Sequence, residues 1–157
     1  MKTFSHLKVL IIDDASIVVV TLKSMLIKIG FNDRLISYCS SSRASIQLAR
    51  QESYDLILCD YNLGRSMNGK QVFEEMKYHN LLHEKSTFVL ITGESSSTVV
   101  HSIIELKPDD YLLKPFNVLS LKDRVSAAIS RKHALYQLYK AQSKHLYEEG
   151  VELCDEL

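Results

Sequence analysis

Short apolar runs, each followed by a longer segment of mixed polarity, make up most of the chain. The strongest runs lie at residues 9–12, 56–58 and 88–91, and weaker ones lie at 35–36 and 111–113. The three strongest do not alternate polar with apolar residues, a pattern typical of strands that are buried on both faces of a parallel sheet. We therefore expect five strands in a parallel arrangement.

Four segments between these runs have helical spacing. They span residues 15–29, 41–52, 69–79 and 96–106. Gly30 follows the first of them, and glycine is common just past the end of a helix. Strands that alternate with helices predict an α/β fold with a doubly wound, five-stranded parallel sheet. The apolar residues that we expect to define the first helix are Ile17, Val20, Met25 and Ile29.

The composition limits the class of protein. The chain has 157 residues, 46% of them hydrophobic, which is enough for one domain with a core and a short appendage. Lys+Arg and Asp+Glu number 19 each, so bulk charge does not indicate a nucleic-acid or membrane surface. No apolar run approaches the ~20 residues of a membrane span, and the amino terminus lacks the pattern of a signal peptide. The three cysteines form no CxxC pair, which favours a reducing compartment, so we expect a cytoplasmic protein.

Chemically reactive side chains stand at the predicted carboxyl ends of the strands. Asp13 and Asp14 end the first strand, and Asp60 ends the third. Thr92 ends the fourth strand and Lys114 ends the fifth. Because the carboxyl ends of parallel strands meet at one edge of the sheet, where ligands of such folds bind, we expect these five side chains to form one cluster.

Three carboxylates in one cluster repel each other unless a cation lies between them. Oxygen ligands and an incomplete protein cage favour Mg²⁺, with Mn²⁺ as the alternative ion. The Lys114 ammonium and the Thr92 hydroxyl suit a phosphoryl group, and phosphoryl transfer depends mainly on positioning and electrostatics. Asp60 is then the candidate nucleophile, which would form an acyl phosphate. The sequence has no GxxxxGK[ST] nucleotide loop, so another molecule must bring the phosphoryl group.

Four sequence motifs resemble the receiver domain of bacterial response regulators, the family that includes the chemotaxis regulator. They are LIIDDAS, LILCDYNLG, VLITGE and DDYLLKPF, and the resemblance covers about residues 7–130. It implies the flavodoxin-like form of the α/β fold and a Mg²⁺ ion bound by Asp13, Asp14 and Asp60. It also implies that Asp60 is phosphorylated. In the same family pattern Thr92 is the switch hydroxyl and Lys114 pairs with the phosphate.

The same resemblance assigns supporting roles near the site. The backbone carbonyl of Asn62 matches a metal ligand, and Tyr111 matches the aromatic switch residue, although plain packing explains Tyr111 nearly as well. The side chains of Asn62 and Glu94 match positions that tune hydrolysis, and this combination predicts a short-lived acyl phosphate. Pro115 matches a proline that usually follows a cis peptide bond. The sequence departs from the family pattern at Gly64, where proline is common.

The carboxyl-terminal segment has a helical pattern of its own. From Ser120 the chain has no proline and no glycine until Gly150, and thirty residues of helix would span about 45 Å. We divide the chain into a receiver domain, residues 1–131, and a helical extension, residues 132–157. The extension either packs back on the receiver, forms a dimer, or begins a longer helical output region. Its apolar and aromatic stripe consists of Leu135, Leu138, Tyr139, Leu146 and Tyr147.

Together these features predict a phosphorylation-dependent receiver rather than an enzyme. The phosphodonor would be a histidine kinase or a phosphotransfer protein, and the output would be binding of a downstream protein target. A homodimer could form through the C-terminal helix. It could also form through the face made by the fourth helix at residues 96–106, the fifth strand at 111–113 and the fifth helix, which follows that strand. One alternative is a degenerate receiver that binds partners without phosphorylation. Another is a phosphatase-type enzyme with an Asp nucleophile, but Asn62 stands where that class usually has a second acid.

Overall fold

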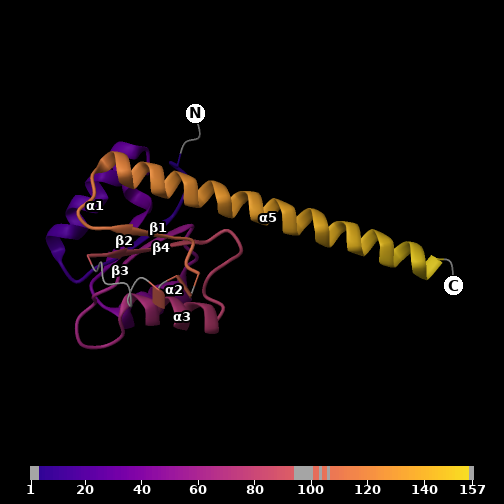
Figure 1. The fold of residues 1–157 in the computed structure, drawn as a ribbon, viewed down its shortest axis with the longest axis horizontal. Helices are drawn as coiled ribbons and strands as arrows, with labels where there is room; N and C mark the ends of the chain where they lie inside the picture. Colours follow the sequence, from indigo (N-terminus) through magenta and orange to yellow (C-terminus); the bar gives the residue numbers. More distant parts are fainter. Residues whose placement is uncertain (1–3, 94–100, 103, 106, 156–157) are drawn as a thin grey trace.

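Five parallel strands form a single sheet, and helices cover both of its faces (Figure 1). The computed structural model describes residues 4–93, 101–102, 104–105 and 107–155. The strand order β2-β1-β3-β4-β5 is doubly wound and confirms the predicted flavodoxin-like fold. The strands are β1 (Val9–Ile12), β2 (Ile36–Cys39), β3 (Leu56–Asp60), β4 (Thr87–Thr92) and β5 (Asp110–Leu113).

The helices divide between the two faces of the sheet. The first and last of them, α1 and α5, contact each other on one face, and α2 and α3 contact each other on the opposite face. Residues 101–102 and 104–105 are also helical, and the rest of the helix predicted at 96–106 lies outside the described residues. The helices are α1 (Ser16–Ile29), the 3₁₀ turn η1 (Asp33–Leu35), α2 (Ser42–Gln51), α3 (Gly69–Tyr78) and α5 (Val118–Asp155).

The three central strands are buried along their whole length. Every residue of β1, β3 and β4 is buried, which confirms the strands predicted from continuous apolar runs. Successive side chains point to opposite faces, so Leu58 joins the core under α1 and α5 while Cys59 joins the core under α2 and α3. Burial of both faces is the main favourable contribution to this fold, and it makes the sheet a firm frame for the residues at its edges.

The apolar residues that predicted α1 do not all lie on its buried face. Ile29 is buried and Met25 packs partly against the core, but Ile17 and Val20 are 77% and 67% exposed. The helix is apolar on both sides, so helical spacing alone did not decide which stripe meets the sheet. The spacing of Ile17, Val20, Met25 and Ile29 therefore predicted the helix but not its buried face. The buried residues of α1 are Val19, Leu22, Leu26 and Ile29, which follow one another at helical spacing.

The last helix, α5, is continuous over 38 residues, or about 57 Å. It packs on the core through Leu121, Val125 and Ala128, and then runs past the body of the domain (Figure 1). The predicted helical extension is therefore present, and its stripe does not pack back on the domain. The boundary between residues 131 and 132 stays a prediction. The exposed fractions in the stripe are 47% for Leu135, 62% for Leu138, 63% for Tyr139, 60% for Leu146 and 73% for Tyr147.

In the described part of the chain, no helix is long and apolar enough to cross a membrane. Although α5 has the length of a membrane span, it carries charged residues along most of its course.

Candidate functional site

Three carboxylates meet at the carboxyl edge of the sheet. Strands β1 and β3 are neighbours, with Ile12 paired to Cys59. The residues that follow this pair, Asp13 and Asp60, therefore lie side by side. Asp14 comes from the same turn as Asp13, and carboxylate oxygens of Asp13, Asp14 and Asp60 lie within 4.8 Å of one another. The structure thus brings together the three acids that sequence analysis placed at strand ends.

Lys114 and Thr92 reach the same edge from strands β5 and β4. Lys114 directly follows β5, and its backbone N–H donates to the carbonyl of Thr92 at 2.9 Å. The Lys114 ammonium lies 3.2 Å from Asp60 Oδ1 and 3.9 Å from Asp13 Oδ2. The Thr92 side chain is buried at the end of β4. The peptide bond between Lys114 and Pro115 is cis, as the resemblance implied.

The electrostatics of this edge favour protonation of Asp13 and Asp60. Burial raises the pKa of Asp60, and the Asp13 carboxylate raises it further, while Lys114 lowers it. Burial also raises the pKa of Asp13, an effect that the N–H of Ala15 and the Lys114 ammonium only partly offset. A single ammonium therefore does not compensate the negative charge that the fold collects here. Binding of a cation would remove this unfavourable free energy.

Asp13 provides the observation that tests whether a metal ion fits. Its Oδ1 accepts a hydrogen bond from the N–H of Ala15 at 2.9 Å, but its buried Oδ2 has no hydrogen-bond partner among the described residues. A buried polar atom without a partner costs roughly 1–3 kcal/mol, and such atoms are uncommon. Three carboxylates at this spacing are oxygen donors of the kind that Mg²⁺ prefers. Asp13, Asp14 and Asp60 therefore fit the predicted ion.

Gly69 shapes the edge from the side of α3, and sequence analysis missed it. A Cβ atom at this position would overlap the carbonyl oxygen of Asp60, so only glycine lets α3 begin so close to β3. The N–H of Gly69 donates to the carbonyl of Tyr61 at 2.8 Å. Asn68 caps the helix in a reciprocal pair with Gln71. A glycine after a capping asparagine was the sequence signal for the start of α3. The close approach of this helix to β3 is visible only in the structure.

The supporting positions are placed as follows. Asn62 lies in the turn after β3, and its side chain is exposed. Gly64 in the same turn has a φ of 85°, which glycine adopts readily and proline cannot, so glycine suits this backbone. Tyr111 on β5 is half-buried, with its ring centroid 5.9 Å from the guanidinium of Arg124. Glu94 lies outside the described residues.

An apolar surface adjoins the acidic cluster. Ile17 and Val20 on α1 are exposed, as is Tyr38 on β2. Val20 and Tyr38 line a cavity of about 290 Å³ whose walls also include Asp13 and Asp14. Exposed apolar groups beside a reactive site are typical of a surface that another macromolecule covers. Ile17, Val20 and Tyr38 therefore form a candidate contact surface.

The thiols near this edge are poorly suited to redox chemistry. Burial raises the pKa of Cys39 to about 11, and burial raises that of Cys59 as well. Both cysteines are free, and the reactive form of a cysteine is the thiolate. The carboxylates and Lys114, rather than these two thiols, are thus the candidate reactive groups of this edge.

Most of the chain matches known proteins in sequence. The family model of the response regulator receiver domain matches residues 9–126, more than half of the chain. The transcriptional regulatory protein YvrH of Bacillus subtilis (strain 168) is 31% identical over 139 residues, which cover 88% of this chain and 54% of YvrH. The transcriptional regulatory protein ZraR of Escherichia coli (strain K12) is 24% identical over 133 residues, which cover 85% of this chain and 29% of ZraR. The chain thus spans only part of the length of these relatives.

Solved structures support the fold independently. The chemotaxis protein CheY4 of Vibrio cholerae superposes with a TM-score of 0.68 at 20% identity, covering 78% of this chain and 98% of CheY4. At this level of identity the likeness shows the fold alone, whereas the family model rests on the sequence. The chain therefore belongs to the response regulator receiver domain family of two-component signalling, whose members are typically regulatory rather than enzymatic.

Proposed function

We propose that this chain is a phosphoacceptor, in which Asp60 takes a phosphoryl group from the histidine of a histidine kinase or phosphotransfer protein, with Mg²⁺ as cofactor. The observation that carries the proposal is the acidic cluster of Asp13, Asp14 and Asp60, whose oxygens lie within 4.8 Å of one another. Among the described residues, one buried oxygen of this cluster has no hydrogen-bond partner. Lys114, 3.2 Å from Asp60, supplies the positive charge that an incoming phosphoryl group needs.

Asp60 supplies the nucleophile. One of its carboxylate oxygens attacks phosphorus, a P–O bond forms, and the P–N bond of the phosphohistidine breaks, so that imidazole leaves with the electron pair of that bond. The products are an acyl phosphate and the free histidine, and no further reactant is consumed. The Lys114 ammonium offsets negative charge on the phosphoryl oxygens. Bound Mg²⁺, held by Asp13, Asp14, Asp60 and the carbonyl of Asn62, would neutralise the carboxylates and hold a phosphoryl oxygen.

The raised pKa of Asp60 links cation binding to reactivity. Asp60 must be ionised to attack phosphorus, yet burial and the neighbouring Asp13 carboxylate disfavour that state. Positive charge in the cluster lowers the pKa of Asp60 and so increases the fraction of the nucleophile that is ready to react. The acids that crowd the nucleophile thus favour binding of a cation beside it.

Thr92 and Tyr111 would convert the modification into a change of shape. The phosphoryl group adds about −1.5 to −2 charges at pH 7 next to the buried Thr92 hydroxyl. We expect that hydroxyl to turn toward the phosphoryl oxygens and the Tyr111 side chain to follow into the space it leaves. Asn62 and Glu94 would tune the access of water to the acyl phosphate, and a polar pair at these positions predicts a short lifetime.

Two surfaces would serve the partners. The phosphodonor would dock on the exposed apolar surface of Ile17, Val20 and Tyr38, because this surface borders the cluster that holds Asp60. The downstream protein target, or a second copy of the chain, would bind the exposed stripe of α5 or the face around β5 and α5. Exposed apolar residues such as Leu138 and Leu146 are available there for contact.

Intact-mass spectrometry after incubation with phosphoramidate tests the proposal. We expect wild-type protein to gain one phosphoryl group in the presence of Mg²⁺ and none after chelation. Asp60→Asn should gain none, while the matched control Asp33→Asn, which alters an exposed aspartate in η1, should behave as wild type. A folded wild-type protein that gains no phosphoryl group would instead support the degenerate receiver. A gain that persists in Asp60→Asn would place the modification elsewhere.

A further inference from the structure

A second pair of aspartates lies at the opposite, amino-terminal edge of the sheet. Asp110 is the first residue of β5, and its side chain is 9% exposed. Its Oδ1 lies 3.3 Å from Arg124 Nη1, and its Oδ2 lies 3.2 Å from Arg131 Nη2. The neighbouring Asp109 accepts from Lys132 at 2.8 Å, and its backbone carbonyl accepts from Arg131 at 3.1 Å. All three cations come from α5, so Asp110 at the start of β5 and the preceding Asp109 together hold successive turns of the helix.

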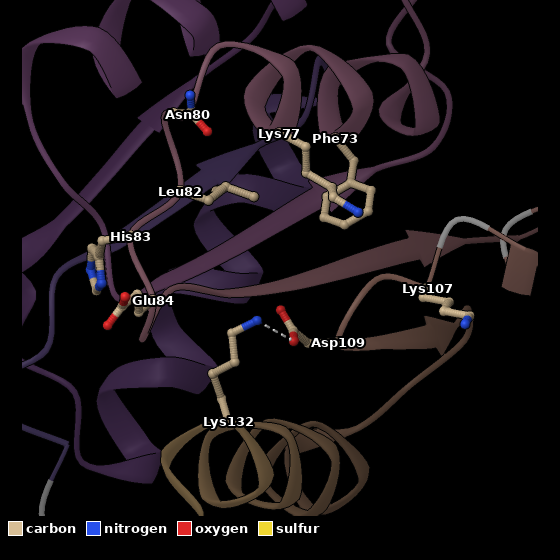
Figure 2. A pocket seen from close by; sticks show the side chains of 9 residues that line it. All are labelled: Phe73, Lys77, Asn80, Leu82, His83, Glu84, Lys107, Asp109 and Lys132. Atoms are coloured by element: carbon tan, nitrogen blue, oxygen red, sulfur yellow. Dashed lines mark hydrogen bonds and ion pairs between the residues drawn. The ribbon is translucent and has the colours of Figure 1, made fainter. Parts of the chain in front are cut away.

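Arg131 and Lys132 follow the last apolar packing of α5, whereas Arg124 lies within the packed stretch. Within the described part of the chain, Ala128 is the last buried apolar residue of α5. Beyond it, a cavity of about 300 Å³ separates the helix from the end of α3, and Figure 2 shows Lys132 extending toward Asp109 with Phe73 and Lys77 across the open space. Here α5 is therefore held by ion pairs across a hollow rather than by close packing.

A second hollow lies farther along the helix. It measures about 360 Å³, and Glu84 and Lys132 line it together with Leu135, Tyr136 and Tyr139 of α5. One further charged contact crosses this region, because the Lys85 ammonium lies 4.5 Å from the centroid of the Tyr136 ring. Because Lys132 lines both hollows, this stretch of α5 is not closely packed against the domain. The charged contacts are therefore what restrains the direction of the helix here.

The same ion pairs touch the proposed switch residue. The backbone N–H of Tyr111 donates to Asp110 Oδ1 at 2.8 Å, and the Tyr111 ring lies under the guanidinium of Arg124. Arg124 in turn shares the Asp110 carboxylate with Arg131. A contiguous chain of contacts thus leads from Tyr111 to the first turn of the distal helix.

We propose that Asp109 and Asp110 form an ionic clamp with Arg124, Arg131 and Lys132. This clamp sets the direction of the distal part of α5, residues 132–152. The position of Tyr111 acts on the clamp through Arg124. The clamp does not depend on phosphorylation. Only its use as a signalling output rests on the function proposed above. Through it, a rearrangement inside the domain would reposition the exposed stripe of the extension.

Spin-label distance measurements on the unphosphorylated full chain test the clamp. Nitroxide labels would be attached to cysteines introduced by Glu74→Cys on α3 and Ser143→Cys on α5, and both positions are exposed. Cys39 and Cys154 would be replaced by serine, and Cys59 can remain because it is fully buried. Far-UV circular dichroism of each variant would establish that α5 stays helical.

The double variant Arg131→Gln/Lys132→Gln removes two cations of the clamp. We expect the distance distribution to broaden by about twofold, since individual exposed ion pairs restrain a helix only modestly. The matched control Lys140→Gln/Lys144→Gln removes the same charge from the same helix outside the clamp and should leave the width unchanged. Equal widths in the two double variants would overturn the clamp.

A second comparison tests the connection to the switch residue. Tyr111→Ala removes the ring beneath Arg124 and should change the distribution in the same direction as Arg124→Gln. Tyr38→Ala, which removes an exposed ring far from the clamp in sequence, should leave it unchanged. A wild-type distribution in Tyr111→Ala would overturn the connection. No phosphodonor is used, so either result is independent of whether Asp60 accepts a phosphoryl group.

Discussion

Two groups of aspartates stand at opposite edges of the same sheet. At the carboxyl edge, oxygens of Asp13, Asp14 and Asp60 lie within 4.8 Å of one another, and among the described residues one ammonium, that of Lys114, is paired with them. At the amino edge, an aspartate pair at the start of β5 faces three cations of α5 at 2.8–3.3 Å. Burial raises the pKa of two acids in the first group.

The difference shows which kind of acidic cluster indicates a bound ligand. The presence of aspartates alone does not indicate one, because the amino-edge pair is already paired with cations of α5 and holds that helix in place. At the carboxyl edge the fold supplies too little positive charge and leaves one buried oxygen of Asp13 without a hydrogen bond among the described residues. Uncompensated negative charge, rather than the number of acids, therefore distinguishes the candidate metal site from a structural ion-pair cluster.

Lys114→Met should produce the largest effect, because it removes the ammonium nearest the nucleophile. We expect the rate of phosphorylation by phosphoramidate to fall about 10²–10³-fold, the usual loss when one electrostatic contact to a transition state is deleted. Intact-mass time courses would measure this rate. Lys122→Met, which alters an exposed lysine of α5, serves as the control. A wild-type rate in folded Lys114→Met would show that this charge takes no part in the transfer.

Gly69→Ala should disturb the carboxyl edge through the backbone rather than through charge. The new Cβ would overlap the carbonyl oxygen of Asp60, so we expect a loss of about 1–3 kcal/mol in the free energy of unfolding. Gly150→Ala is the matched control, because nothing lies within 4 Å of its Cβ and helix propensity predicts a gain of about 0.5–1 kcal/mol. Urea unfolding would measure both. A neutral Gly69→Ala would contradict the close approach of α3 to β3.

Asp13→Asn should stabilise the protein at neutral pH in the absence of Mg²⁺. A pKa raised by burial means that the native state binds protons more tightly than the unfolded state. The resulting penalty is fully present above the raised pKa and disappears as the pH falls toward the ordinary value of 3.8. We expect a gain of about 1–2 kcal/mol at pH 7 that vanishes near pH 4, measured by urea unfolding of variant and wild type. A loss of stability at pH 7 without Mg²⁺ would contradict this interpretation.

Asp110→Asn should change the free energy of unfolding in the opposite direction from Asp13→Asn, and by a smaller amount. The amide can still accept the N–H of Tyr111, but the ion pairs to Arg124 and Arg131 lose their charge. Because both guanidinium groups are more than half exposed, we expect a loss of only about 1 kcal/mol. The loss should shrink at ~1 M salt, where exposed pairs are screened. Stabilisation by Asp110→Asn would remove the distinction between the two edges.

Sequence reasoning reached the carboxyl edge because two strong regularities act together. Continuous apolar runs identify central parallel strands, and parallel topology brings their ends together, so Asp13, Asp60, Thr92 and Lys114 could be grouped from their positions alone. This grouping of residues at one edge depends little on how individual side chains pack. The acidic cluster was therefore predictable before any coordinates.

The remaining features depend on choices that local sequence does not determine. The first helix is apolar on two sides, so only the tertiary packing shows that Val19 rather than Val20 faces the core. The clamp joins Asp110 to Arg131 across 21 positions, and in the sequence both are ordinary surface charges. Its detection required the distances between β5 and α5.

Mg²⁺ titration followed by amide chemical shifts tests the contrast between the two edges most directly. The titration would compare wild type, Asp13→Asn and Asp110→Asn under identical conditions. We expect saturable shifts around Asp60 in wild type and in Asp110→Asn, and their loss in Asp13→Asn, because the carboxylates at the carboxyl edge carry the uncompensated charge that attracts a cation. Saturable binding that survives in Asp13→Asn, or that disappears in Asp110→Asn, would contradict the assignment of the metal site to the carboxyl edge.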